Sequence, residues 1–121
     1  MRKLEELLKH YDAVCAMVEE DVKESFVQEC LINGFKFHDG GSLTGKNCGP
    51  RMALHSFNRT VWYIAGMCWH AYFTNPRAII EIDPGATTKI FINYKAYFTG
   101  KKKYVYKTLD ELVEPEPILY S

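Results

Sequence analysis

The stretch RTVWYIAGMCWHAYFTNPR, residues 59–77, lies near the middle of the chain, is its most aromatic segment and has an arginine at each end. Residues 60–65 and 67–73 each alternate with a period of two on either side of Gly66. β-Branched and aromatic residues fill most of these positions, a pattern typical of β-strands. We therefore expect a central β-hairpin, with one face on a core and the other lining a pocket or a partner subunit.

Length and composition indicate a single domain spanning residues 1–121. The hydrophobic share of 47% and the charged share of 25% are ordinary for a globular protein. The cysteines form no C-x-x-C pair and no secretory signal precedes them, so we expect reduced, buried thiols in a cytosolic protein. The longest apolar run, residues 61–73, is too short to span a bilayer, so no membrane segment is predicted.

The first 33 residues are expected to form a helix, then a strand, then a second helix. Leucines separated by charges indicate an amphipathic helix over residues 2–10. Residues 11–18 form a mostly apolar octet, and the acidic cluster after it favours a new helix over roughly residues 20–33, ending at Asn33-Gly34. The spacing of the valines also fits one continuous helix over residues 2–33, but we predict the interrupted arrangement.

The remaining chain is rich in strand signals. Strands are expected at residues 35–38, 52–57, 78–82, 89–98 and 104–106, separated by turns with Gly, Asn or Pro. A capping box from Thr108 to Glu111 predicts a short helix through Val113, and the apolar tail 118–120 is expected to pack on a neighbouring surface or a second subunit. The fold class predicted is α+β, an antiparallel β-sheet of about six strands with N-terminal helices and a short C-terminal helix.

Residues 40–46, GGSLTGK, match the first seven positions of the phosphate-binding P-loop pattern. Asn47 replaces the Ser or Thr that would hold magnesium, and Cys48-Gly49-Pro50 is a poor start for the helix that the motif requires. We interpret the segment as a glycine-rich surface loop, which could also serve as a lid over a ligand.

Catalytic and metal-binding signatures are weak. The residues His38, His55, His70, Cys48 and Cys68 could be combined into a zinc site, but they lack the tight, repeated spacing of structural zinc ligands. A nucleophilic cysteine needs an electropositive, partly open setting that an apolar strand does not indicate. The sequence therefore predicts no metal, no cofactor and no enzymatic activity.

Arginines provide the first indication of a binding site. Three of the four in the chain, Arg51, Arg59 and Arg77, flank the aromatic strands. Their guanidinium groups bind phosphates through paired hydrogen bonds. The net charge of zero disfavours a protein that binds genomic nucleic acid, because such domains are usually basic. A small phosphorylated ligand is the better match.

Aromatic and amide side chains provide the second indication. Trp69, Tyr72 and Phe73 offer flat faces on which bases stack, and Asn93 could read a base or ribose edge. Taken singly, each is better explained as a core or solvated residue. The clustering of arginines and aromatic residues favours a nucleotide pocket.

Three runs carry a family resemblance: GFKFHDGGSL (34–43), RTVWYIAGMCWHAYF (59–73) and FINYKAYF (91–98). They resemble the first type of phage Thoeris anti-defence protein, a cyclic-nucleotide sponge. The resemblance implies a non-enzymatic protein of the host cytoplasm that sequesters a cyclic ADP-ribose isomer in pockets at a subunit interface. It also implies a homodimer or higher homo-oligomer, and some members of the family hold a cyclic oligonucleotide at a second site.

The chemistry of each side chain indicates which part of the nucleotide it is expected to bind. Arg59 and Arg77 are expected at the pyrophosphate, Phe73 and Trp69 against adenine, and Asn93 at a polar edge. Arg51 is a further candidate for a phosphate, and Tyr72 offers another stacking face.

Two other functions fit the same sequence. One is a small protein that binds and inhibits a host protein through exposed aromatic residues. The other is a small nucleotide-processing enzyme. Tight capture needs preorganised donors and stacked faces, whereas turnover needs an acid, a base or a metal. The sequence favours capture.

Overall fold

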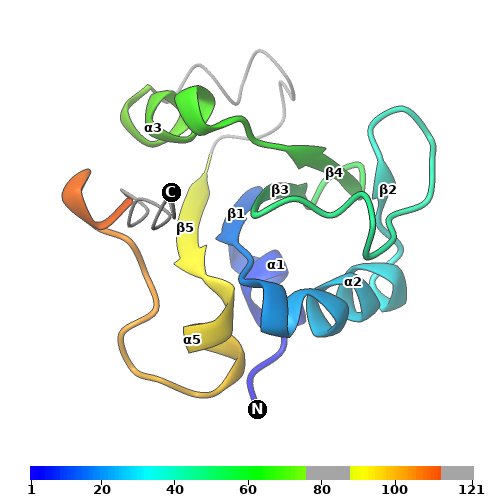
Figure 1. The fold of residues 1–121 in the computed structure, drawn as a ribbon, viewed down its shortest axis with the longest axis horizontal. Coiled ribbons are helices and arrows are strands. Elements are labelled where there is room, and N and C mark those ends of the chain that lie inside the picture. The colour runs from blue at the N-terminus through cyan, green and yellow to red at the C-terminus, as the bar shows by residue number, and fades with distance from the viewer. Residues whose placement is uncertain (76–87, 113–121) are drawn as a thin grey trace, which may run out of the picture.

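A mixed β-sheet lies between two layers of helices (Figure 1). The computed structural model describes residues 1–75 and 88–112, and within these ranges the sheet has five strands in the order β2-β4-β3-β1-β5. The pairs β1–β3 and β3–β4 are antiparallel, whereas β1–β5 and β2–β4 are parallel. The strands are β1 (Ala13–Met17), β2 (Lys36–Phe37), β3 (Arg51–His55), β4 (Thr60–Tyr63) and β5 (Lys89–Asn93).

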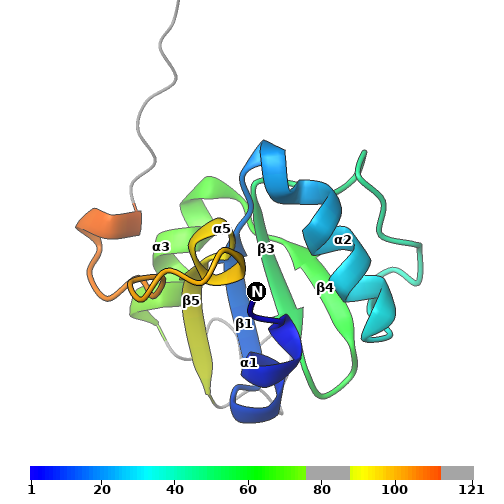
Figure 2. The same cartoon turned by 90° about the horizontal axis from the view of Figure 1, so that it is seen from below.

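Helices cover both faces of the sheet. On one face lie α1 (Leu4–His10), α2 (Lys23–Ile32) and α5 (Tyr94–Phe98), and on the other lies α3 (Gly66–Thr74). Figure 2 is viewed from the side of α1, α2 and α5, which stand in front of the strands. Short 3-10 turns occur at Glu20–Val22 and Asp110–Leu112. None of the helices in the described ranges combines the length and apolar character needed to cross a membrane.

Side-chain alternation along the strands produces two hydrophobic clusters, one on each face. The larger cluster packs under α1, α2 and α5 and includes the fully buried Val14 and Met52. The smaller cluster packs under α3 and includes Cys15, Trp69 and Phe91. Side chains of β5 therefore contribute to the core on the α3 face.

The predicted helix, strand, helix order at the N-terminus is confirmed by α1, β1 and α2. One continuous helix is excluded because residues 13–17 pair with both β3 and β5. A buried carboxylate joins these elements: Glu29 accepts hydrogen bonds from the Leu4 N–H (2.8 Å) and from the Tyr94 hydroxyl. It satisfies an N-terminal amide of α1 and fixes α5 to α2.

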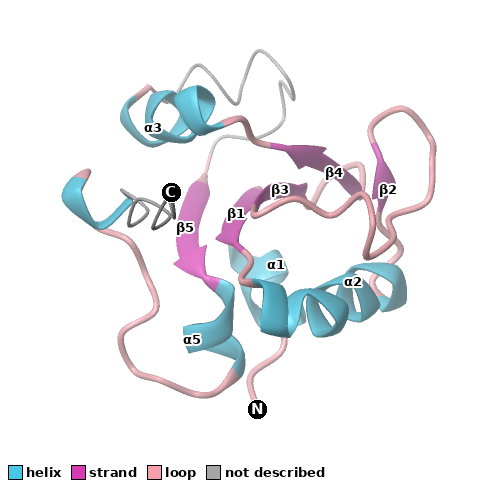
Figure 3. Cartoon of the chain, in the orientation of Figure 1, coloured by secondary structure: helices cyan, strands magenta, loops and turns pink. Residues whose placement is uncertain are grey.

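The predicted central hairpin is wrong in its second half. Residues 60–63 form β4, but Gly66–Thr74 form α3 (Figure 3). Nearly every residue of this segment is apolar or aromatic, so the strand period and the helix period both fit. Trp69, Tyr72 and Phe73 have the helical spacing i, i+3, i+4 and pack together on the sheet. The aromatic segment therefore covers a face of the sheet and does not extend it.

The α+β fold class is confirmed, although the sheet is mixed and has five described strands, where the sequence predicts about six antiparallel ones. The strand predicted at residues 89–98 ends at Asn93, whose side chain accepts a hydrogen bond from the Ala96 N–H (2.9 Å) and so caps α5. Residues 104–106 form a single bridge to β5, between Val105 and Ile92.

Four predictions concern residues outside the described ranges: the strand at 78–82, the position of Arg77, the end of the last helix at Val113 and the packing of the tail 118–120. The start of that helix is described. The Thr108 hydroxyl donates to the Glu111 carboxylate (3.2 Å), and a 3-10 turn follows at residues 110–112. A capping interaction is therefore present, but the short helix that follows it is a 3-10 turn.

The four cysteines are all free, and three of them are buried. Burial raises the pKa of Cys15 to about 12 and that of Cys48 to about 11. The expectation of buried thiols is confirmed for these two residues and for Cys30, but it is wrong for Cys68, which is exposed.

Candidate functional site

Trp69 is a core residue. Its side chain is 1% exposed, and its indole N–H donates to the Leu112 carbonyl (3.1 Å). Its ring meets the ring of Phe91 edge to face, with centroids 4.9 Å apart. Trp69 therefore fixes α3 and the C-terminal segment to β5, and no face of it is open to a ligand.

Arg59 lies on the opposite side of the sheet from the α3 aromatics. It occupies the turn between β3 and β4 with a φ of 55°, and its guanidinium carbon lies 5.3 Å from the centroid of the Phe35 ring. Phe35 belongs to the larger cluster, on the α2 face, whereas Trp69 and Phe73 pack in the smaller one. Arg59 and these two rings therefore do not share a pocket.

Arg51 and Asn93 do share one face and one end of the sheet. Both are register partners of Met17, so they lie two strand spacings apart, roughly 10 Å. Both side chains have structural partners: Arg51 Nε donates to the Ile64 carbonyl (3.3 Å), and Asn93 Nδ2 donates to the Tyr106 hydroxyl (3.1 Å). Asn93 also caps α5, so its amide is largely engaged within the fold.

Tyr72 and Phe73 lie at the C-terminal end of α3, next to Lys89 of β5. Lys89 Nζ donates to the carbonyls of Tyr72 and Asn75, the latter at 3.2 Å, and so caps the end of the helix. Burial lowers the pKa of Lys89 and raises that of Tyr72. Phe73 is half-buried and packs edge to face on Phe91.

Of the predicted site residues, Phe73 lines a groove at the outer edge of β5. We call this hollow of about 480 Å³ the β5-edge groove. Its volume lies in the range of small-molecule sites. It is lined by Tyr11, Phe73, Lys89, Ile90, Phe91, Tyr104, Val105, Tyr106 and Lys107.

The segment after α5 forms the outer wall of this groove and runs beside β5 in Figure 2. The Asn93 N–H donates to the Tyr104 carbonyl (2.8 Å), and the Tyr106 N–H donates to the Phe91 carbonyl (2.8 Å). The Arg2 side chain lies over the Tyr104 ring, with its guanidinium carbon 4.4 Å from the ring centroid. These contacts place two tyrosine rings at the groove.

A second hollow of about 430 Å³ adjoins the groove, since both are lined by Tyr104, Val105 and Lys107. Its other lining residues are Lys102 and Lys103, so we call it the lysine hollow. All three lysines are exposed, and their ammonium groups have no hydrogen bond or ion pair to the described residues. Aromatic rings at one end and cations at the other suit a ligand with a flat ring and a phosphate.

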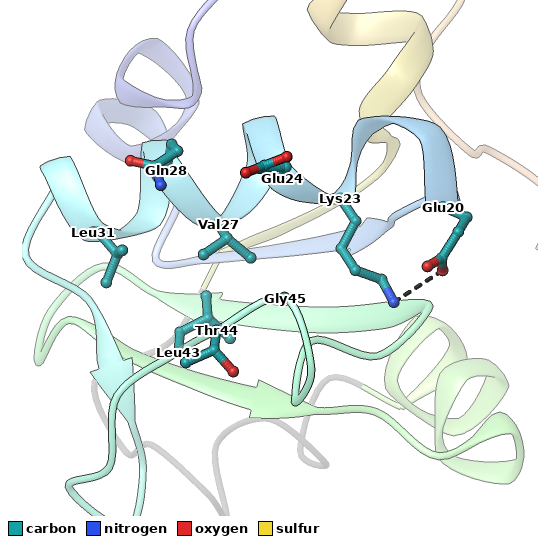
Figure 4. Close-up of a pocket in the computed structure, with 9 residues that line it drawn as sticks. All are labelled: Glu20, Lys23, Glu24, Val27, Gln28, Leu31, Leu43, Thr44 and Gly45. Carbon is teal, nitrogen blue, oxygen red and sulfur yellow. Dashed lines mark ion pairs between the residues drawn. The ribbon is translucent and has the colours of Figure 1, made fainter.

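A different groove, of about 510 Å³, separates α2 from the glycine-rich loop (Figure 4). Val27 and Leu31 point from α2 toward the loop residue Leu43. At the rim, Lys23 is paired with Glu20 (2.9 Å), and Glu24 adds a further negative charge. The acidic rim repels phosphate.

The P-loop match also fails in its structure. The element that follows Lys46 is β3 and not a helix, and residues 44–47 form a turn in which the Thr44 N–H donates to the Asn47 side chain (2.6 Å). Among the described residues, no group of three or more His, Cys, Asp and Glu side chains is placed to hold a metal ion.

Lys89, Tyr104, Tyr106 and Lys107 are absent from the site predicted from the sequence. One signal could have indicated the last three: residues 101–107, KKKYVYK, combine four lysines with two tyrosines in a chain of zero net charge. Nothing local indicates Lys89, because its neighbours in the groove come from distant parts of the chain. Comparisons with models of known protein families, with curated proteins and with solved structures find no match.

Proposed function

We propose that this protein captures a small phosphorylated nucleoside of the cyclic ADP-ribose class in the β5-edge groove and holds it chemically unchanged. The observation that carries the proposal is the junction of an aromatic groove with a hollow lined by three lysines, through their common residues Tyr104, Val105 and Lys107. The base would occupy the aromatic end and the phosphates the lysine hollow.

Stacking supports the placement of the base. Phe73 and Tyr106 are each half-buried and both belong to the rim of the smaller cluster, so one part of each ring is anchored. The Tyr106 hydroxyl is bonded to Asn93 Nδ2 at 3.1 Å, which fixes the orientation of the ring. Rings that are ordered before binding lose little entropy when a base stacks on them.

Charge supports the placement of the phosphates. The segment 101–107 carries four lysines and no acidic residue. The Glu111 carboxylate accepts hydrogen bonds from the Thr108 hydroxyl (3.2 Å) and from the Lys107 N–H (3.3 Å). The lysine ammonium groups stay available for an anion, which they attract over about 8 Å at physiological salt.

Capture is favoured over turnover by the residue types that line the groove. Its described lining consists of tyrosine, phenylalanine, lysine and aliphatic side chains. Acid–base and nucleophilic catalysis relies mainly on carboxylates, imidazoles and thiols. The lowered pKa of Lys89 makes that amine the main candidate for chemistry, but its ammonium is held by two backbone carbonyls.

The choice of the cyclic ADP-ribose class rests on the family resemblance of the sequence, which also supports a role in blocking bacterial Thoeris defence from the host cytoplasm. A homodimer or higher homo-oligomer, and a second site for a cyclic oligonucleotide, belong to the same proposal. The groove lies at an open sheet edge, where a second subunit could complete it.

Calorimetric titration with cyclic ADP-ribose isomers, followed by release of the ligand on denaturation and its analysis by mass spectrometry, tests this function. Saturable binding with recovery of unchanged ligand is expected. Altered ligand would replace capture by a nucleotide-processing activity.

A protein-binding function is the second candidate, and it has its own support. The large apolar residues exposed in the described structure include Phe57 at 80%, Tyr63 at 51% and Met67 at 90%. Tyr63 and Met67 flank the junction of β4 with α3, where a partner protein could cover both. Failure of every nucleotide to bind in the same titration would favour this candidate.

A further inference from the structure

The outer edge of β5 carries a pair of backbone groups that the fold leaves open. Even-numbered residues of this strand bond inward to β1, as shown by the Ala13 N–H that donates to the Thr88 carbonyl (2.9 Å). Odd-numbered residues therefore direct their N–H and C=O groups outward. Of these groups, the Asn93 N–H donates to the Tyr104 carbonyl, and the Phe91 carbonyl accepts from the Tyr106 N–H.

Pairing with the outer segment stops at Phe91. After Tyr106 the chain turns away, and the Lys107 N–H donates to the Glu111 carboxylate (3.3 Å) and not to β5. The Lys89 carbonyl and the Phe91 N–H, both on the outward side, have no hydrogen-bond partner among the described residues. Both residues line the β5-edge groove, and these two backbone groups, an acceptor and a donor, are neighbours on the outward side of the strand.

Unpaired backbone groups at a strand edge form hydrogen bonds readily with an incoming ligand. The Watson–Crick edge of adenine offers the complementary pair, because its N6 amino group donates and its N1 accepts. We infer that the Lys89 carbonyl and the Phe91 N–H read this edge of an adenine base with an unsubstituted N1 that enters the β5-edge groove. This inference rests on the proposed function and assigns the base that the groove selects.

The rings at the groove fit the same placement. A base that bonds to the strand edge lies beside β5, and both Phe73 of α3 and Tyr106 of the outer segment, which pack on the smaller cluster, would adjoin it on the α3 side. A base held by its edge and on one face is fixed in orientation, and its ribose would then point out of the groove toward Lys107 and the lysine hollow.

Hypoxanthine reverses the hydrogen-bonding polarity, because its O6 accepts and its N1–H donates. It would set an acceptor against the Lys89 carbonyl and a donor against the Phe91 N–H. Mismatched polar groups in a partly enclosed site are left unpaired, which weakens binding. Discrimination by one such pair corresponds to about 10- to 100-fold in affinity.

Three ligands test the inference on the full-length protein by calorimetry: ADP-ribose, its hypoxanthine counterpart and its 7-deaza-adenine counterpart. We expect ADP-ribose and the 7-deaza compound to bind with equal affinity, and the hypoxanthine compound to bind about 10- to 100-fold more weakly.

If the hypoxanthine compound binds as tightly as ADP-ribose, the Lys89 carbonyl and the Phe91 N–H do not recognise the base edge, while nucleotide capture stands. Weakened binding of the 7-deaza compound alone would also overturn it, because the N7 edge would then be the one recognised. Failure of all three ligands to bind would overturn the inference together with capture of ADP-ribose-type ligands.

Discussion

The ring of Phe73 meets the ring of Phe91 edge to face, with centroids 5.2 Å apart and planes at 80°. The contact joins the C-terminal end of α3 to β5, and Phe73 remains half-exposed at the β5-edge groove. Both residues line the groove, but Phe91 is buried in the core, whereas Phe73 is partly exposed. The pair explains how a helix that covers the sheet also forms one wall of a site at its edge.

Replacing Phe73 by leucine should weaken nucleotide binding while preserving most of the packing on Phe91. Leucine keeps an apolar side chain of similar size but removes the flat face, and stacking on an aromatic ring contributes about 1–3 kcal/mol per base. Calorimetry gives the affinity. Phe57→Leu is the matched control, because Phe57 is 80% exposed and does not line the groove. Binding of Phe73→Leu with unchanged affinity would remove this ring from the site.

Replacing Lys107 by alanine should weaken binding about tenfold, or about 1.4 kcal/mol, and reduce the dependence of affinity on salt. Lys107 lines both hollows, and its ammonium has no partner among the described residues. Arg59→Ala is the control, since that guanidinium lies over Phe35 on the opposite face. The reverse result, with loss of binding in Arg59→Ala only, would restore the arginine pocket predicted from the sequence.

Replacing Asn93 by alanine should lower the free energy of unfolding by about 0.5–2 kcal/mol, because the Asn93 side chain caps α5. Urea denaturation measures this effect. Asn93→Ser retains a capping oxygen and should recover most of the lost stability. An alanine variant as stable as the parent protein would show that the cap contributes nothing.

Tyr94 should make the protein lose stability at alkaline pH. Burial, and then the hydrogen bond to Glu29, raise the pKa of Tyr94 in the folded state above its ordinary value of about 10. A raised folded-state pKa means that the stabilisation is complete below about pH 10 and is lost as the pH rises above it. The buried thiols of Cys15 and Cys30, whose pKa values are also raised by burial, add to the same decline.

The variant Tyr94→Phe should therefore be less stable at pH 7, by about 1–3 kcal/mol, because the buried Glu29 carboxylate loses a donor. Its stability should also fall less steeply above pH 10. Urea denaturation between pH 7 and pH 11 gives both quantities, with the exposed Tyr63→Phe as the control. A decline identical to that of the parent protein would contradict the role of Tyr94.

The N-terminal half of the fold could be predicted because its signals are local. Leucine spacing, an acidic cluster and Asn33-Gly34 define α1, β1 and α2 without reference to distant residues. The segment 66–74 could not be assigned in this way, because a nearly continuous apolar run satisfies both the strand period and the helix period. Only packing of Trp69 and Phe73 on Phe91 decides in favour of the helix.

The site was harder to predict than the fold. The candidate groove is lined by aromatic residues and lysines, but no local pattern in the sequence assigns such residues to one face of the sheet or the other. Arg59 directly precedes β4, and α3 follows that strand, yet Arg59 and Phe73 pack on opposite faces of the sheet. Lys107 follows Phe73 by more than thirty positions and lines the same groove, because residues 104–106 return along β5.

Backbone amide shifts on addition of ADP-ribose to the isotope-labelled protein test the location of the site most directly. We predict that the largest shifts fall on Phe73, on residues 89–91 and on residues 102–107. Shifts confined to α2 and residues 43–45 would place the ligand in the groove of Figure 4 and contradict the account.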